Sequence, residues 1–155
     1  MTLESNLQQE KVKHLDLSNF TKVESGTSVR DTIAAMRQQA HHCAIIMAGD
    51  SLIGIFTDRD ILRKVVDAPE TWDQPIDQVM TPTPITVNSN DPADAALALM
   101  DAKHFRNVPV LNKKGQVIGN LTHHAIIKYL ADRFPESVYN LPPNPDQVTR
   151  RRDGA

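Results

Sequence analysis

Apolar residues occur along the chain in short runs separated by polar turns. The stretches 43–56 and 108–121 each hold two apolar segments around a turn, AGDS in the first and KKGQ in the second, which is typical of a β-hairpin. The stretches 58–66 and 123–130 carry apolar residues at i, i+1 and i+4, as on a buried helix face. A short strand at FTKV or PITV and a helix after it precede each hairpin. The order β-α-β-β-α predicts an α+β unit.

This unit occurs twice because the chain contains an internal repeat. The copies match at an offset of 64 through the first helix and, as we align them, at 65 from the next strand onward. This alignment places one extra residue of the second copy near KHFRN. The period is longer than that of solenoid repeats and predicts two mini-domains. The matched pairs are Val23/Val87, Ser25/Ser89, Ile33/Leu97, Met36/Met100, Ile45/Val110, Ile53/Ile118, Gly54/Gly119, Thr57/Thr122, Ile61/Ile126, Leu62/Ile127 and Val65/Leu130.

Neither copy is large enough to be stable alone, since a unit of roughly 50 residues buries little surface. We therefore expect the two copies to pack through their sheets as an intramolecular pseudo-dimer. The prolines of TWDQPIDQVMTPTP favour an extended crossing between them. The predicted division is an N-terminal extension (1–14), a first repeat (15–68), a linker (69–82), a second repeat (83–131) and a Pro-rich, basic tail (132–155).

Residues that cap helices precede the predicted helices of both copies. In the first copy Ser28 is expected to cap the first helix, with Asp31 three residues later. In the second copy Asp91 is expected to cap, with Pro92 in the first helical position.

Composition narrows the function classes. A net charge of −2 gives no drive toward nucleic acid or anionic membranes, and no apolar window approaches the roughly 18 residues of a membrane span. The polar N-terminus does not match a secretory signal, and the single cysteine forms no disulfide within the chain, so we expect a cytoplasmic protein. Six glycines, with no Ser/His/Asp constellation and no phosphate-binding glycine loop, predict a protein that is not an enzyme.

The repeat, the VMTP joint, the RNVPV strand and GIFTDRDIL together resemble a tandem pair of cystathionine β-synthase (CBS) domains, or Bateman module, of the stand-alone bacterial type. The resemblance covers about residues 15–131. It implies two clefts between facing sheets, regulatory binding of an adenosyl ligand (AMP, ADP, ATP or S-adenosylmethionine) and pairing of modules into disc-like homodimers. It implies no required cofactor.

Thr57 and Asp60 carry the strongest candidate chemistry. Their spacing is that of a capping box, which is a structural explanation. The second interpretation is ligand binding. A helix N-terminus and a threonine hydroxyl bind phosphate, and a carboxylate offers two acceptors to the two hydroxyls of a ribose. In the family the residues at these positions play those parts. Arg59 is either a solvated arginine paired to Asp58 or a phosphate ligand.

The second copy lacks this carboxylate. Ala125 stands where the first copy has Asp60, and a methyl group cannot hold a diol. Thr122 retains the ability to cap its helix or to contact a phosphate. The sequence therefore predicts one competent cleft and one that is impaired or used differently.

Three further groups are expected near the clefts from the resemblance. Basic and polar residues at the start of the second strand of each copy would approach phosphates, Phe105 would flank a base, and the start of the second repeat's first strand would contact adenine. The corresponding residues are His41, His42, Phe105, Arg106, Asn107, Ile85 and Thr86. The competing explanations are core packing for Phe105, a plain surface position for Arg106 and plain strand packing for Ile85.

The histidines do not predict a metal site. Adjacent histidines on a strand point to opposite faces, so each pair offers one ligand to a site, and no Cys or carboxylate spacing completes a zinc set.

The leading functional hypothesis is a regulatory module that senses an adenosyl ligand and signals to a partner protein, itself unidentified. The alternative is a ligand-independent dimerisation or scaffold module with empty clefts.

Overall fold

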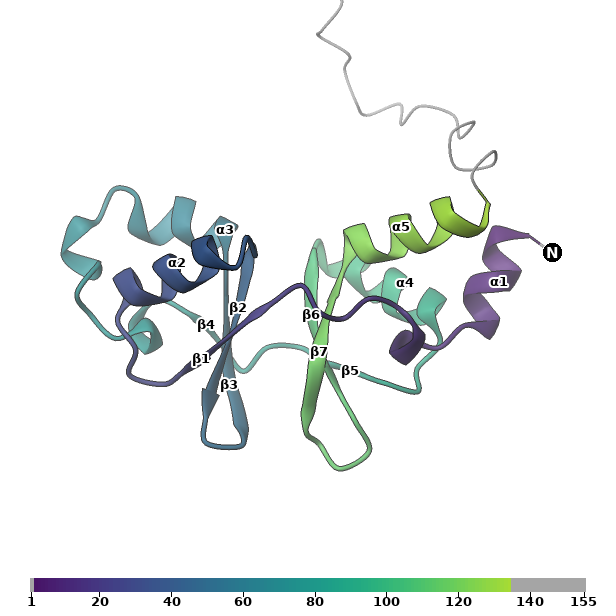
Figure 1. Cartoon of the computed structure of the whole chain (residues 1–155), viewed down its shortest axis with the longest axis horizontal. Coiled ribbons are helices and arrows are strands. Elements are labelled where there is room, and N and C mark those ends of the chain that lie inside the picture. The colour runs from purple at the N-terminus through teal and green to yellow at the C-terminus, as the bar shows by residue number, and fades with distance from the viewer. Residues whose placement is uncertain (1, 135–155) are drawn as a thin grey trace, which may run out of the picture.

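The computed structural model describes residues 2–134, and the tail from residue 135, including the arginines 150–152, lies outside this range. Two small β-sheets stand side by side in the middle of the molecule, and helices cover their outer faces (Figure 1). This is the α+β arrangement of two β-α-β-β-α repeats that the sequence predicts.

The first sheet has the order β1-β2-β3-β4. β1 runs parallel to β2, whereas β2–β3 and β3–β4 are antiparallel. The β2–β3 connection is the hairpin predicted at AGDS, and Gly49 occupies its left-handed position with φ 62°. The strands are β1 (Thr21–Glu24), β2 (Cys43–Ala48), β3 (Ser51–Thr57) and β4 (Thr81–Pro82).

The second sheet has the order β5-β6-β7, with β5 parallel and β7 antiparallel to β6. Its strands are β5 (Val87–Asn88), β6 (Asn107–Leu111) and β7 (Val117–Thr122). Helices on the outer faces are α2 (Val29–Gln38), α3 (Asp58–Asp60), α4 (Ala93–Lys103) and α5 (His123–Arg133). α3 continues directly into the π-helical turn η2 (Ile61–Val65), whose closing bond joins the Val66 N–H to the Ile61 carbonyl at 3.0 Å.

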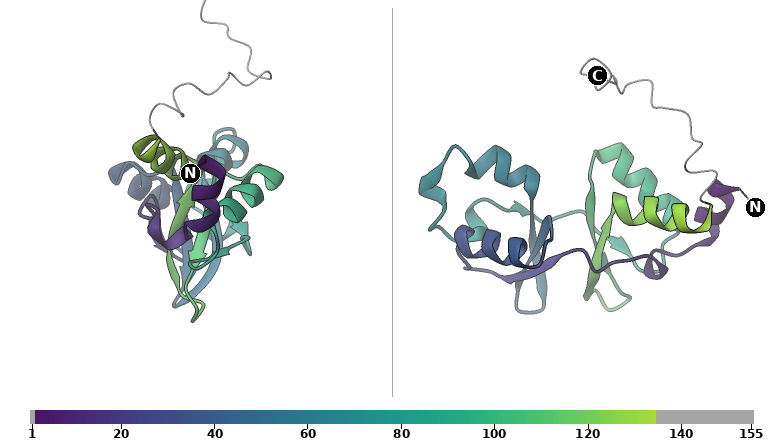
Figure 2. Two further views of the ribbon diagram at one scale, coloured as in Figure 1. Left: turned by 90° about the vertical axis from the view of Figure 1, so that its right-hand side faces the viewer. Right: turned by 45° about the horizontal axis from the view of Figure 1, so that its top comes forward.

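Each repeat completes its core with a segment that lies far away in the sequence. The N-terminal α1 (Leu3–Gln9) and the 3-10 turn η1 (Val12–His14) pack on the second repeat, where Leu7 and Val12 join its buried core. The turns η3 (Pro69–Thr71) and η4 (Ile76–Gln78) pack on the first repeat, where Ile76 is buried. The chain therefore crosses between the repeats twice, as Figure 1 and the right view of Figure 2 show.

The contact between the repeats is apolar on the side of the first sheet. Cys43, Ile45, Met47 and Ile55 form a buried cluster on the face of this sheet that lies opposite its helices, and Val117 of β7 packs against it. The packing of the two copies through their sheets, expected from their small size, is thus present.

The predicted site of the extra residue is wrong. β6 pairs with its neighbours so that Val87 lies beside Val110, as Val23 lies beside Ile46, which keeps the offset of 64 through this strand. The offset becomes 65 only in β7, since Thr57 pairs with Cys43 and Thr122 with Asn107. The insertion therefore lies in the hairpin turn. Side-chain similarity alone misled the alignment because both strands are uniformly apolar.

This register changes which residues are equivalent at the start of the second strand. His41 corresponds to Phe105, and His42 to Arg106, rather than to Arg106 and Asn107. The backbone agrees, because His41 N–H and Phe105 N–H each bond the carbonyl of the preceding helix at 2.9 Å. The residues just before them, Ala40 and His104, share a left-handed backbone with φ 56° and 57°.

Three of the four main helices, α2, α3 and α5, begin where the sequence predicts, and α4 does not. Ser28 caps α2 by accepting the Asp31 N–H at 3.0 Å, as predicted. In the second copy Pro92 itself is the N-cap, so α4 begins one residue later than expected. The Asp91 carboxylate accepts the Asn88 N–H at 2.9 Å, which closes the turn before the helix and leaves the helix N-terminus without this cap.

Candidate functional site

Asp60 is held at the junction of β3, α3 and the linker. Its side chain is only 11% exposed, and one oxygen accepts the Thr57 backbone N–H at 3.0 Å, the carboxylate half of the predicted capping box. The Thr57 hydroxyl lies 3.5 Å from the same oxygen. The second oxygen faces the Thr81 hydroxyl at 3.4 Å and the Lys64 ammonium at 3.2 Å.

The end of the linker and the residues that follow it, 81–86 (the crossing segment), begin beside this carboxylate. β4 pairs with β3 at Gly54 and Ile55, which brings Thr81 to Asp60, and the chain then crosses toward β5. Ile85 is 40% exposed on this crossing, so the expected strand packing of its side chain is wrong. Thr86 is half-buried. Exposed apolar surface here is available to a flat apolar ligand group.

The two adjacent histidines of the first repeat differ in their contacts. His42 is exposed, and its Nδ1 lies 2.6 Å from the Asp58 carboxylate. His41 is half-buried and its Nδ1 lies 3.2 Å from the Thr21 hydroxyl. Both line a groove of about 310 Å³ between α2 and α3, together with Asp58 and Ile61, but Asp60 is not on its wall. A larger groove of about 540 Å³ on the outer side of α2 contains none of the predicted ligand residues.

Arg59 reaches across to the second repeat. Its guanidinium donates to the His104 carbonyl at 3.4 Å, at the C-terminal end of α4, while Asp58 is paired with His42. The pairing of Arg59 with Asp58, one of the two alternatives drawn from the sequence, is therefore absent. The neighbouring Phe105 is 36% exposed, which rules out its core placement. Arg106 is exposed as well, so Arg59 contacts the second repeat next to two exposed residues in the sequence, Phe105 and Arg106.

The equivalent position of the second repeat is closed. Ala125 is buried, and its N–H donates to the Thr122 hydroxyl at 2.9 Å, so Thr122 serves as a helix cap. Asn107 accepts from the buried Asn120 amide at 3.1 Å, and that amide also donates to the Asn19 carbonyl at 3.0 Å. Asn120 thus fastens the N-terminal segment to β7, and Asn107 accepts a second bond from the same amide.

Cys43 adds no reactivity to the site. Burial raises the pKa of its thiol well above the ordinary range, and the nearby carboxylates of Asp60 and Asp58 raise it further. Within residues 2–134 no three His, Cys, Asp or Glu side chains are arranged to hold a metal ion. In the same range no helix has the length and apolarity that crossing a membrane requires.

The structure brings Thr57, Asp60 and the crossing segment together at one edge of the first repeat, and Arg59 to the seam with the second. Thr122 lies apart from these, at the N-terminus of α5. Sequence reasoning missed Lys64 and Thr81, the two remaining contacts of the Asp60 carboxylate. The i,i+4 spacing of Asp60 and Lys64 is a signal that predicts their ion pair. Thr81 has no such signal, because its contact depends on the β3–β4 pairing.

Comparison with known proteins identifies the family. The CBS domain model matches residues 12–67 and 76–132, which is most of the chain and covers both repeats. The chain belongs to the CBS domain family and carries two CBS domains in tandem. The resemblance to a tandem CBS pair, predicted from the sequence, is confirmed.

Individual relatives share the domain pair and differ in size. CBSCBSPB3 of Arabidopsis thaliana is 37% identical over 114 residues, which is 71% of this chain and 20% of the relative, so the chain spans about a fifth of that protein. Among solved structures, protein MJ1004 of Methanocaldococcus jannaschii is 28% identical with a TM-score of 0.70, over 84% of this chain and 63% of the other.

Two structures with the same fold were solved with adenosyl ligands. CBSX2 in complex with AMP is 22% identical with a TM-score of 0.67, over 79% of this chain and 97% of the other. The CBS domain pair of MJ0100, in complex with 5′-methylthioadenosine and S-adenosyl-L-methionine, is 22% identical with a TM-score of 0.71, over 80% and 98%. At this identity the likeness establishes the fold.

Proposed function

We propose that this protein is a regulatory module that binds an adenosyl ligand at the first repeat. Binding would change the conformation of the module, and a partner protein would respond to that change. The observation that carries the proposal is the buried carboxylate of Asp60 at a helix N-terminus, beside the exposed crossing segment. A carboxylate bonds the two hydroxyls of a ribose, and the positive end of a helix dipole favours a phosphate. The AMP and S-adenosylmethionine complexes of the neighbouring structures support this ligand class.

Some of the other predicted residues are assigned ligand roles in this proposal. Arg59, Arg106 and His42 would meet phosphates, and Phe105 and Ile85, whose side chains are partly exposed, would offer apolar surface to a base. In this proposal the residues take no part in bond-making chemistry, and the protein acts by shifting between conformations that differ in ligand affinity. The cytoplasmic location expected from the sequence stays a prediction.

Calorimetric titration with AMP, ADP, ATP and S-adenosylmethionine tests this proposal. At least one of them should bind saturably, and Asp60→Ala should weaken it by about tenfold or more, because a hydrogen bond to a charged group is lost. Asp50→Asn is the matched control, since this exposed turn carboxylate lies at the far end of the β2–β3 hairpin. Absence of binding to all four would favour the scaffold alternative. Binding with unchanged affinity in Asp60→Ala would show that the ligand binds at another place in the molecule.

We also propose that the module forms a homodimer through its helices. Leu62 is 70% exposed and Val66 54% exposed on the helix that follows Asp60, and Ile127 is 42% exposed at the position of α5 that matches Leu62. Apolar side chains exposed in this way on two related helices are typical of an interface. Leu62→Lys should convert a dimer to a monomer in size-exclusion chromatography with light scattering. A wild-type monomer at micromolar concentration would contradict the proposal.

A further inference from the structure

The Asp60 carboxylate is saturated before any ligand arrives. An ionised carboxylate has about four acceptor sites, and four donors approach it here. Two of them are held by other structure. The Thr57 N–H is fixed by the backbone at 3.0 Å, and the Lys64 ammonium, 3.2 Å away, also donates to the Val79 carbonyl at 2.9 Å. The other two are the hydroxyls of Thr57 and Thr81, at 3.5 and 3.4 Å.

The two hydroxyl contacts are long for O–H···O bonds and are free to rotate away. They lie one on each carboxylate oxygen, which is the arrangement that two ribose hydroxyls require. An incoming diol can therefore replace them one for one, while the Thr57 N–H and Lys64 remain. This exchange leaves no buried acceptor without a donor at either stage, which limits its cost.

We propose that Lys64 is the positioning residue of this site, holding the Asp60 carboxylate in the orientation in which it selects a ribose diol. The inference rests on the proposed function and deepens it by assigning the selectivity. Lys64 anchors the second oxygen from the side of the linker, through Val79, and supplies the positive charge that a buried carboxylate needs.

The second repeat supports this assignment as an internal comparison. At the positions of Asp60 and Lys64 it has Ala125 and Tyr129, so both partners of the ion pair are replaced. The Tyr129 hydroxyl is used elsewhere, with Asn6 and Glu10 at 2.6 and 2.8 Å. The Lys64 segment forms the π-helical turn η2, whereas α5 is a regular α-helix throughout. π-Helical turns occur preferentially at functional sites.

The test compares the affinities for AMP and 2′-deoxy-AMP by calorimetry. In the wild type the deoxy ligand should bind about ten- to a hundredfold more weakly, since one hydrogen bond to a carboxylate is missing. Lys64→Met should reduce this ratio to below about threefold, and Lys64→Arg should keep most of it, because the cation is retained. Arg63→Met removes the same charge from the neighbouring position and should leave the ratio unchanged. A merely destabilised fold would weaken both ligands together.

A measurement without ligand tests the positioning role of Lys64 separately from ligand binding at Asp60. Lys64→Met should speed hydrogen exchange of the Thr57 amide by about tenfold, because its acceptor is no longer held, and Arg63→Met should not. If the wild type bound AMP and 2′-deoxy-AMP with nearly equal affinity, the ribose role of Asp60 would be overturned. The exchange rate of the Thr57 amide would still show whether Lys64 holds the Asp60 carboxylate. Unchanged exchange and an unchanged ratio in Lys64→Met would overturn the inference.

Discussion

Gly54 and Gly119 occupy the same place in the two repeats, where a segment from elsewhere in the chain crosses the third strand. A Cβ on Gly54 would lie 2.2 Å from the Met80 sulfur, and one on Gly119 would lie 2.4 Å from the Leu17 Cβ and 2.7 Å from the Leu17 carbonyl oxygen. The lack of a side chain thus allows both crossings. A Cβ at Gly54 would meet only the flexible Met80 side chain. A Cβ at Gly119 would also meet backbone atoms of Leu17.

Gly119→Ala should therefore destabilise the fold more than Gly54→Ala. Met80 can rotate away, so we expect a loss of about 1 kcal/mol for Gly54→Ala, against about 3 kcal/mol where the Leu17 backbone must shift. Urea denaturation of both variants beside the wild type measures the difference. Equal losses, or a larger loss for Gly54→Ala, would show that the N-terminal crossing is not packed as described.

At this scale the sequence predicts local chemistry well and tertiary contacts poorly. The Thr57–Asp60 capping box depends only on a spacing of three residues, so it could be predicted from the sequence. The Asp60–Thr81 contact joins residues 21 apart and depends on strand pairing. The Asp91 cap was predicted wrongly because its carboxylate bonds an N–H before the helix instead.

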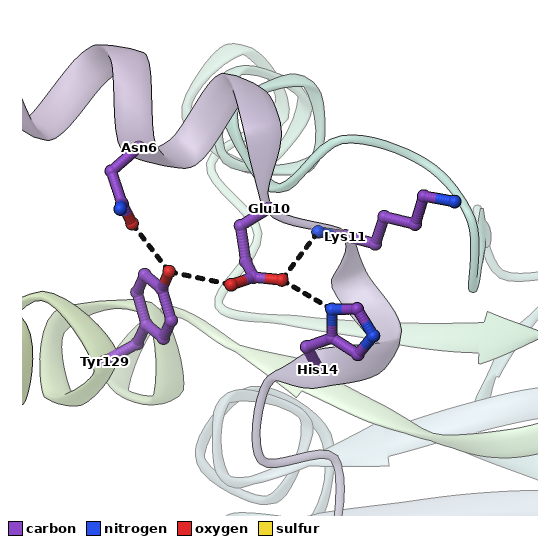
Figure 3. A network of polar contacts seen from close by, with 5 residues as sticks. All are labelled: Asn6, Glu10, Lys11, His14 and Tyr129. Atoms are coloured by element: carbon purple, nitrogen blue, oxygen red, sulfur yellow. Dashed lines mark hydrogen bonds and ion pairs between the residues drawn. The ribbon is translucent and has the colours of Figure 1, made fainter. Parts of the chain in front are cut away.

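Among the elements, α1 has a role that the sequence pattern does not predict. The sequence predicts only an N-terminal extension over residues 1–14, yet Leu7 is buried against the second repeat. A polar network fastens it to α5, in which Glu10 contacts Tyr129, His14 and the Lys11 N–H (Figure 3). Short amphipathic segments with few apolar residues give weak periodic signals, so only their packing reveals them.

The Glu10 network makes part of the stability dependent on pH. Burial raises the pKa of Glu10, but the hydrogen bonds from His14, Tyr129 and the Lys11 N–H outweigh it, and the net pKa lies below the ordinary value of 4.5. The unfolded state therefore binds a proton more readily than the folded state. The stabilisation is complete above about pH 4.5 and is lost as the pH falls through the lower folded pKa.

Glu10→Gln removes this titration and should lower the unfolding free energy by about 1 kcal/mol at pH 7, with the deficit shrinking below pH 4. Urea denaturation at pH 7 and pH 3.5 checks both parts. Gln8→Ala, on the exposed side of the same helix, is the control for helix propensity. A deficit that stays constant between the two pH values would contradict the assigned pKa shift.

For the whole molecule, the repeat was enough to predict the fold. Two copies of β-α-β-β-α, each too small alone, led to the pair of sheets with helices outside (Figure 1). The exchange of segments, in which residues 3–15 complete the second repeat and 69–80 the first, was not predictable from pattern. The position of the extra residue also required the strand register. Both depend on contacts between distant residues, which periodicity does not report.

We propose that the adenosyl ligand binds at Asp60 in the first repeat and not at the matching position of the second. Titration of the isotopically labelled protein with AMP, followed by the amide resonances of Thr57 and Thr122, distinguishes the two positions. These amides lie at equivalent positions of the two repeats. We expect the Thr57 resonance to shift saturably and the Thr122 resonance to stay nearly fixed. A saturable shift at Thr122 with none at Thr57 would contradict the account.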